Sequence, residues 1–274
     1  MVDRIGEISM KRKENGFAAT GILYTILLVF LVLMTTLLAT LSSRSRILEK
    51  LKKDAKSESA EVKNVVYANG TEIYYNPDTG KKCTTAVSTP ETKSGCMKWY
   101  AFNDESESAT VNVILDHNTT VEVAWNSNGN NSEMKEVADT LETDTSNWKS
   151  DLNPRLIEAN EIAKITGHPT FDAGKTGQDW FYFDSNNQTQ KANASNKSKY
   201  AWLFDYTYVC TSYGCNKSDS STNGYWTSTR KIDNSYYAWL VYRSGGLYSN
   251  GVTGTYGGIR PVITISKFLL INLL

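Results

Sequence analysis

The chain has only two histidines, His117 and His168, and its four cysteines lack the two-residue spacing that is typical of zinc ligands. With so few imidazoles, neither a metal centre nor a pairing of a nucleophile with a histidine base can be assembled from the sequence. Carboxylates such as Asp205, Asp219 and Asp233 are scattered, which gives no support to a calcium site. We therefore expect no cofactor, no bound metal and no enzymatic activity.

The chain also lacks a basic region that would attract a nucleic acid. Residues 1–64 contain 11 basic and 7 acidic residues, whereas residues 65–274 contain 18 basic and 22 acidic residues. The larger part is thus weakly acidic, and we expect no nucleic-acid partner. The basic surplus lies near the N-terminus, where it would suit anionic lipid headgroups.

One long stretch, from Phe17 to Leu41, has no charged residue. At about 1.5 Å per residue it is long enough for a bilayer crossing, which takes roughly 20 apolar residues. The pattern predicts a transmembrane helix over 17–41 that follows a basic leader, 1–16, and makes the lipid bilayer a partner. The polar, helix-compatible residues 42–64 predict an amphipathic stalk.

At the start of this stretch, the basic segment Lys11-Arg12-Lys13 is followed by Gly16-Phe17 and then by the apolar helix. This arrangement resembles the N-terminus of type IV prepilins and pseudopilins, and the resemblance covers roughly residues 10–60. It implies that a prepilin peptidase cleaves between Gly16 and Phe17 and that the pilus assembly machinery is a partner. The family usually has a glutamate at the fifth mature position, where this chain has Gly21, so the resemblance supports anchoring more than polymerisation.

The cysteines form two local pairs in the sequence. We predict the disulfides Cys83–Cys96 and Cys210–Cys215, although the sequence leaves the other two pairings open. Disulfides need an oxidising compartment. Lysines and arginines flank both ends of the apolar stretch and do not settle its orientation. The cysteines and the prepilin-like leader together predict a single-pass protein of a bacterial cell membrane with most of the chain extracellular.

Beyond residue 65, the patterns predict strands, then helices, then strands, which is an α+β arrangement. Asn69-Gly70 and His117-Asn118 each predict the turn of a hairpin, and helices are expected over 133–141 and 156–165. Further strands are expected at 180–183, 200–204, 225–229, 237–243 and 259–265. We divide this part of the chain into a β-rich segment, 65–132, a domain, 133–267, and a short tail, 268–274.

Three motifs stand near the C-terminus: Tyr225-Trp226-Thr227-Ser228-Thr229, Ala238-Trp239-Leu240-Val241 and Gly258-Ile259-Arg260-Pro261-Val262-Ile263. In this order they resemble the closing strands of C-type-lectin-fold domains of the formylglycine-generating-enzyme type. The resemblance covers roughly residues 150–267. It implies a C-type-lectin-like domain. Together with the apolar stretch 17–41, it predicts a long membrane helix followed by a β-rich ectodomain that ends in this domain. In the variable proteins of diversity-generating retroelements, which share this fold, the residues between such motifs form a changeable binding face.

The corresponding segments here, 230–237 and 242–256, are rich in Tyr, Ser, Gly and Asn, the mixture that antibody paratopes use. Strand alternation over 237–243 places Tyr237, Trp239 and Val241 on one face and Ala238, Leu240 and Tyr242 on the other. We expect Trp226 and Trp239 to be core residues. The residues expected to contact a ligand are Arg230, Asp233, Asn234, Tyr236, Tyr242, Arg243, Tyr248, Asn250, Thr255 and Tyr256.

These observations predict a surface-displayed, membrane-anchored adhesion protein that binds an unknown surface ligand, either a protein or a glycan. Two alternatives stay open. The chain could be a structural pilin or pseudopilin subunit of a type IV filament or of a secretion or DNA-uptake system. It could also be an enzyme of the formylglycine-generating type. That family uses reactive cysteines near its C-terminus, whereas Cys210 and Cys215 precede the first of the three motifs.

Overall fold

A computed structural model describes residues 24–36, 48–50, 65–86, 92–184, 199–204, 224–242 and 245–271. The chain divides into two compact units, Met1–Ala60 and Glu61–Leu274. Of the residues predicted to matter, Gly16, Phe17, Arg243, Cys210 and Cys215 lie outside the described residues.

In the first unit, residues 24–36 and 48–50 are helical. Large apolar side chains of the first helix are exposed, and its Thr35 hydroxyl donates a hydrogen bond to the Val32 carbonyl. Among the described residues, no helix is both long enough and apolar enough to cross a membrane. The predicted fold class with its membrane helix, and the predicted single-pass location in a cell membrane, are therefore wrong.

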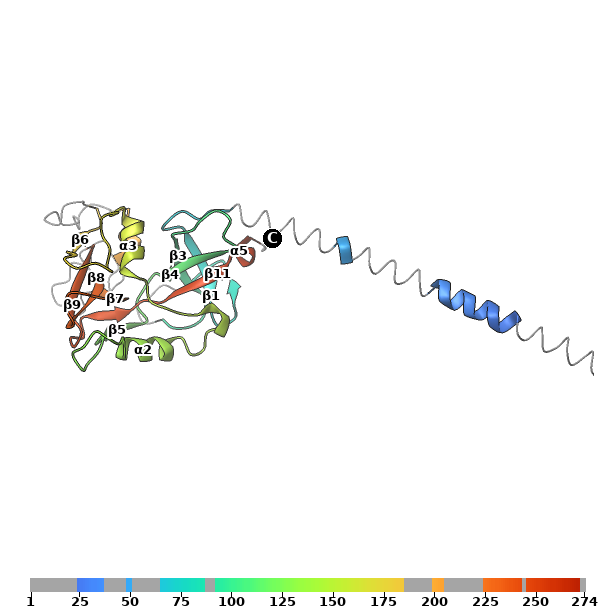
Figure 1. Cartoon of the computed structure of the whole chain (residues 1–274), viewed down its shortest axis with the longest axis horizontal. Coiled ribbons are helices and arrows are strands. Elements are labelled where there is room, and N and C mark those ends of the chain that lie inside the picture. The colour runs from blue at the N-terminus through green and yellow to red at the C-terminus, as the bar shows by residue number, and fades with distance from the viewer. Residues whose placement is uncertain are drawn as a thin grey trace, which may run out of the picture. The chain divides into compact units, whose positions relative to one another are not determined.

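The second unit is a β-rich body with two sheets and short helices, as Figure 1 shows. The five-stranded sheet has the order β11-β4-β3-β1-β2, and every pair in it is antiparallel. Its strands are β1 (Glu72–Asn76), β2 (Lys81–Lys82), β3 (Met97–Phe102), β4 (Thr110–Leu115) and β11 (Val262–Ser266).

The six-stranded sheet has the order β5-β10-β7-β8-β9-β6. Only β7 and β10 run parallel to each other. Its strands are β5 (Thr120–Val123), β6 (Phe181–Tyr182), β7 (Gly224–Arg230), β8 (Tyr237–Tyr242), β9 (Gly246–Gly251) and β10 (Gly257–Ile259). The described ends of β8 and β9 come within a few residues of each other, so these two strands form a hairpin.

The helices of this unit are α2 (Glu136–Asp144), the 3-10 turn η1 (Ser150–Leu152), α3 (Ala159–Thr166), α4 (Ala201–Phe204) and α5 (Lys267–Ile271). The expected helices over 133–141 and 156–165 are present with shifted bounds. Glu158 caps α3 through a reciprocal pair with Glu161, and Gly167, with φ of 74°, ends it. Residues 201–204, expected as a strand, form α4, because a short apolar run suits either structure.

Both expected hairpins are wrong. Residues 65–68 form no strand, and β1 pairs with β2 and β3 instead. β4 and β5 belong to different sheets, since β4 pairs with β3 and β11 while β5 pairs with β10. The residues between them, Asp116 to Thr119, are buried and carry the chain from one sheet to the other. The pair His117-Asn118, whose composition predicts an exposed turn, is instead buried where the chain passes from one sheet to the other.

The alternation expected along β8 is confirmed by the core. Trp239 and Val241 pack with Phe181 and Tyr225 on one side of the six-stranded sheet. Ala238 and Leu240 pack in a second cluster with Trp125 and Trp226. Both Trp226 and Trp239 are buried, as predicted. A third cluster belongs to the five-stranded sheet.

A buried cation connects the two sheets. Arg260, between β10 and β11, donates hydrogen bonds to the backbone carbonyls of Leu115 (2.5 Å), Leu203 (2.6 Å) and Trp202 (2.6 Å). Its guanidinium lies 5.1 Å from the ring of Tyr225, whose hydroxyl donates to the Leu203 carbonyl. Burial raises the pKa of Tyr225 to about 12. Arg260 therefore fixes α4 against the end of β4.

A second buried charge holds α5. The Lys267 ammonium lies 2.9 Å from an Asp104 carboxylate oxygen, and both side chains are fully buried. The same ammonium donates to the backbone carbonyls of Val65 and Glu105, and Asp104 also accepts from the Tyr67 amide. Because Lys267 and Asp104 have close polar partners, these contacts offset the free-energy cost of removing the two charges from water.

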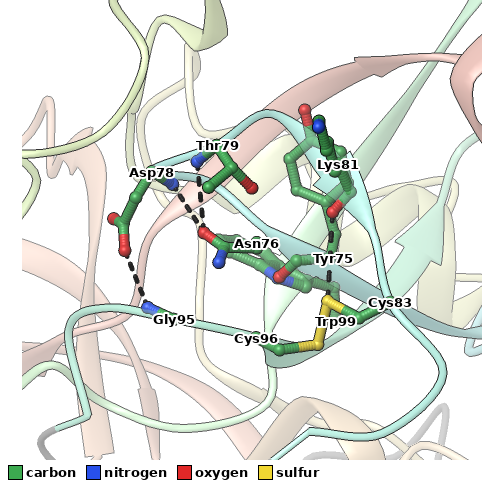
Figure 2. The surroundings of a disulfide bond; sticks show 9 residues. All are labelled: Tyr75, Asn76, Asp78, Thr79, Lys81, Cys83, Gly95, Cys96 and Trp99. Atoms are coloured by element: carbon green, nitrogen blue, oxygen red, sulfur yellow. Dashed lines mark hydrogen bonds between the residues drawn. A yellow bond between two sulfur atoms is a disulfide. The ribbon is translucent and has the colours of Figure 1, made fainter.

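The predicted disulfide Cys83–Cys96 is confirmed (Figure 2). It joins the chain after β2 to the start of β3. Next to it, the Gly95 amide donates to the Asp78 carboxylate, and the Asn76 side chain accepts from the amides of Asp78 and Thr79. The segment that the disulfide closes is thus also held by hydrogen bonds to the β1–β2 turn.

Candidate ligand-binding surfaces

The residues predicted to contact a ligand lie at the two ends of the β8–β9 hairpin. Tyr237 pairs with Gly251 at one end, and Tyr242 pairs with Gly246 at the other. We call the first the turn end, formed by residues 230–237 and 250–253. We call the second the aromatic end, formed by Tyr242, Tyr248 and the aromatic residues that contact them. A single continuous face, as the sequence suggested, does not form.

At the turn end, residues 231–236 form the connection between β7 and β8. The Lys231 amide donates to the Tyr237 carbonyl at 3.0 Å, and the Tyr237 amide donates to the Asn234 carbonyl at 3.2 Å. Three large side chains project into solvent from this turn. Tyr236 is 66% exposed, Ile232 is 47% exposed and Tyr237 is 37% exposed.

The buried side chain of Asn131 organises this turn. Its Nδ2 donates to the backbone carbonyls of Lys231 (2.8 Å), Asn234 (2.9 Å) and Tyr237 (2.6 Å). The Asn131 amide donates to the Ser235 carbonyl at 2.8 Å. Because these bonds go to main-chain oxygens, they do not depend on the exposed side chains of Ile232, Tyr236 and Tyr237.

Most polar side chains predicted to contact a ligand instead hold the loops in place. The Asp233 carboxylate accepts from the Gly177 amide at 2.7 Å and pairs with Lys231 at 3.1 Å. These two interactions, with the Gly177 bond the larger, lower the pKa of Asp233. The side-chain oxygens of Asn234 and Asn250 accept from the amides of Tyr236 and Gly251.

Lys231 completes this loop anchorage. Its ammonium donates to the Gln178 carbonyl at 2.8 Å and lies 5.0 Å from the ring of Trp239. Arg230, by contrast, is exposed, and its side chain makes no ion pair or hydrogen bond with the described residues. The groups that face outward at the turn end are therefore one guanidinium, two tyrosine rings and an isoleucine.

At the aromatic end, Trp180 lies flat on Tyr248, with ring centroids 5.0 Å apart and planes 6° apart. Tyr242 lies 5.0 Å from Tyr248, and Tyr182 lies 5.8 Å from it in an edge-on arrangement. Tyr182 is buried at the base of the group, whereas Trp180, Tyr242 and Tyr248 are half-buried. Loss of water, followed by a hydrogen bond with Tyr182, raises the pKa of the Tyr248 phenol.

Tyr256 and Thr255 belong nearer to the aromatic end than to the turn end. Gly257, the next residue, pairs with Gly224, and Gly224 pairs with Tyr242. Tyr256 is 42% exposed, and its ring packs over Gly254, where any side chain would collide with it. Thr255 is exposed beside it.

Sequence reasoning missed Trp180, Tyr182 and Asn131. The alternation in Trp180-Phe181-Tyr182-Phe183 does indicate that Trp180 and Tyr182 share a face. It cannot indicate that this face lies beside β9, since that depends on the pairing of Tyr182 with Gly246. Asn131 belongs to the polar run from Asn128 to Asn131, whose composition predicts a loop and nothing more specific.

Both histidines are bonded within the fold. His117 is fully buried, with Nδ1 2.5 Å from the Asp116 carboxylate and Nε2 2.9 Å from the Thr92 carbonyl. His168 stacks on Phe181 at 3.8 Å, and its Nδ1 lies 2.9 Å from the Thr166 hydroxyl. Within the part of the chain that the structure describes, no three of the residues His, Cys, Asp and Glu gather to hold a metal ion.

No family model matches this chain, and no curated protein or solved structure matches it either. The resemblances to prepilins and to C-type-lectin-fold domains therefore stay predictions.

Proposed function

We propose that this chain is a binding protein and that the turn end is its principal ligand-binding surface. The observation that carries the proposal is the exposure of Ile232, Tyr236 and Tyr237 on a turn whose backbone is held by the buried Asn131. Burial of such side chains normally stabilises a protein, so their exposure on an ordered turn favours a role in contact with a partner.

The physical properties of the turn end suit recognition. Tyrosine supplies a large amphipathic contact area with only two rotatable side-chain bonds, so ordering it costs little entropy. The turn itself is already ordered by Asn131, which reduces the cost of binding further. Tyr and Arg are also the residues that most often dominate binding energy at interfaces. The predicted resemblance to C-type-lectin-fold domains supports the same proposal, because residues in this region form the binding face in some members of that family.

The test compares the full-length chain with two alanine variants on a panel of immobilised glycans and intact cells. Tyr236→Ala removes the most exposed ring of the turn end. Phe268→Ala is the matched control, because Phe268 is 43% exposed on α5, which lies away from the β8–β9 hairpin in Figure 1. We expect Tyr236→Ala to weaken binding at least tenfold, or about 1.4 kcal/mol, and Phe268→Ala to leave it unchanged. Equal binding by Tyr236→Ala and the wild type would refute the proposal.

A further inference from the structure

Aromatic side chains from three neighbouring strands gather at one end of the six-stranded sheet. They are Trp180 before β6, Tyr182 on β6, Tyr248 on β9 and Tyr242 on β8. We call this set the aromatic row. Its members on β8 and β9 lie on the sheet face that carries Ala238 and Leu240, where Tyr242 and Tyr248 pack against the core.

The row crosses three strands. From β6 through β9 to β8, two strand spacings of about 4.8 Å give a length of about 10 Å. Gly246 leaves space for two of the rings, because a side chain there would meet the rings of Tyr248 (2.8 Å) and Tyr182 (3.2 Å).

None of the four side chains in the row carries a charge at neutral pH. The contacts of Trp180, Tyr182 and Tyr248 are with other aromatic rings and phenol groups. An exposed carboxylate, Asp179, stands next to Trp180 in the chain, and it would repel an anionic ligand.

We propose that the aromatic row is a second binding site, for an uncharged polysaccharide chain. One face of a pyranose ring exposes C–H groups that pack on aromatic rings, while its rim carries hydroxyls that phenol groups can bond. A row of about 10 Å, two strand spacings, is long enough for about two consecutive sugar units of an extended chain. Single-stranded nucleic acid also stacks on aromatic rings, but its binding requires a cationic groove. Within the described part of the chain, the charged residue next to the row in sequence is the acidic Asp179.

This site lies at the opposite end of the hairpin from the turn end and does not depend on the function proposed for the turn end. The test uses isothermal titration calorimetry of the full-length chain with cellohexaose, chitohexaose and maltohexaose. We expect at least one of them to bind, Trp180→Ala to weaken that binding at least tenfold, and Tyr248→Phe, which removes only a hydroxyl, to weaken it by a smaller factor. Tyr236→Ala should bind like the wild type.

The outcomes separate the two sites. Failure of all three oligosaccharides to bind overturns the inference, as does unchanged binding by Trp180→Ala. Binding that is lost in Tyr236→Ala and kept in Trp180→Ala assigns the sugar to the turn end and also overturns the inference. Tighter binding of heparin than of any neutral oligosaccharide overturns it as well, because the row would then select charge. The melting temperature of Tyr248→Phe, expected to match that of the wild type, shows that the fold is intact.

Discussion

The strongest test of the turn end is a change at Asn131, which lies behind the exposed residues. Asn131→Asp keeps the size of the side chain but replaces the Nδ2 donor with an oxygen. That oxygen would face three backbone carbonyls at the present distances of 2.6 to 2.9 Å. Asn131→Ala is the matched control, because it removes the donor without adding a charge.

The expected cost of each variant follows from these contacts. The amide has two N–H groups, and each hydrogen bond of this kind stabilises by about 1 kcal/mol net, so Asn131→Ala should cost about 2 kcal/mol. In Asn131→Asp, burial and the three carbonyls disfavour the carboxylate and raise its pKa above the unfolded value of about 3.9. Each unit of that rise adds about 1.4 kcal/mol at neutral pH. We therefore expect a total of about 4 kcal/mol at pH 7.

The sign of the pH dependence distinguishes the two variants. A carboxyl whose pKa is raised in the folded state costs nothing extra below the unfolded pKa, and its cost grows as the pH rises towards the folded pKa. Asn131→Asp should therefore approach the stability of Asn131→Ala near pH 4 and fall below it by pH 7. The assay is urea unfolding followed by tryptophan fluorescence, since the first tryptophan is Trp99 and the signal reports only the second unit. Equal destabilisation of Asn131→Asp at pH 4 and pH 7 would refute the reasoning.

Three further predictions concern the framework. Reduction of the disulfide between Cys83 and Cys96, which stand 13 positions apart in the chain, should lower the free energy of unfolding by about 3 kcal/mol, as measured by urea unfolding with and without reductant. Lys267→Met should cost about 3–5 kcal/mol in the same assay, because it leaves the Asp104 carboxylate buried without its cation, and a loss below 1 kcal/mol would contradict this account. Because the pKa of Tyr225 is raised to about 12 in the folded state, stability should fall as the pH rises above 10, where the unfolded phenol ionises; Tyr225→Phe should show a smaller fall.

The features that could be predicted from sequence are those set by neighbours in the chain. Alternation along β8 assigned Trp239 and Ala238 to opposite faces, and both pack as that pattern predicts. The Cys83–Cys96 disulfide links cysteines that are close in sequence. The bounds of α3 follow from a capping box and a terminal glycine, both of which act within one helical turn.

The features that sequence reasoning missed depend on long-range pairing. β4 and β5 are joined by only four residues, yet they belong to different sheets. This is because β4 pairs with β11 and β5 pairs with β10, and both partners lie far along the chain. Long-range pairing also places Tyr256 nearer to the aromatic end than to the turn end. The parallel pairing of β10 with β7 brings Gly257, the residue after Tyr256, beside Gly224. No periodic pattern in the sequence specifies which distant strand becomes a neighbour.

The turn end shows how a fold can separate the shape of a binding surface from its side chains. Asn131 bonds to carbonyl oxygens, and the Val252 amide bonds to the carbonyl of Tyr236, so the path of the turn is set through the main chain. Substitutions at Ile232 and Tyr236, whose side chains point to solvent, should then change affinity with little change in stability. A change at Asn131 should do both, because it disorders the turn before any ligand arrives. A residue that contacts no ligand thus controls how well the exposed tyrosines can bind one.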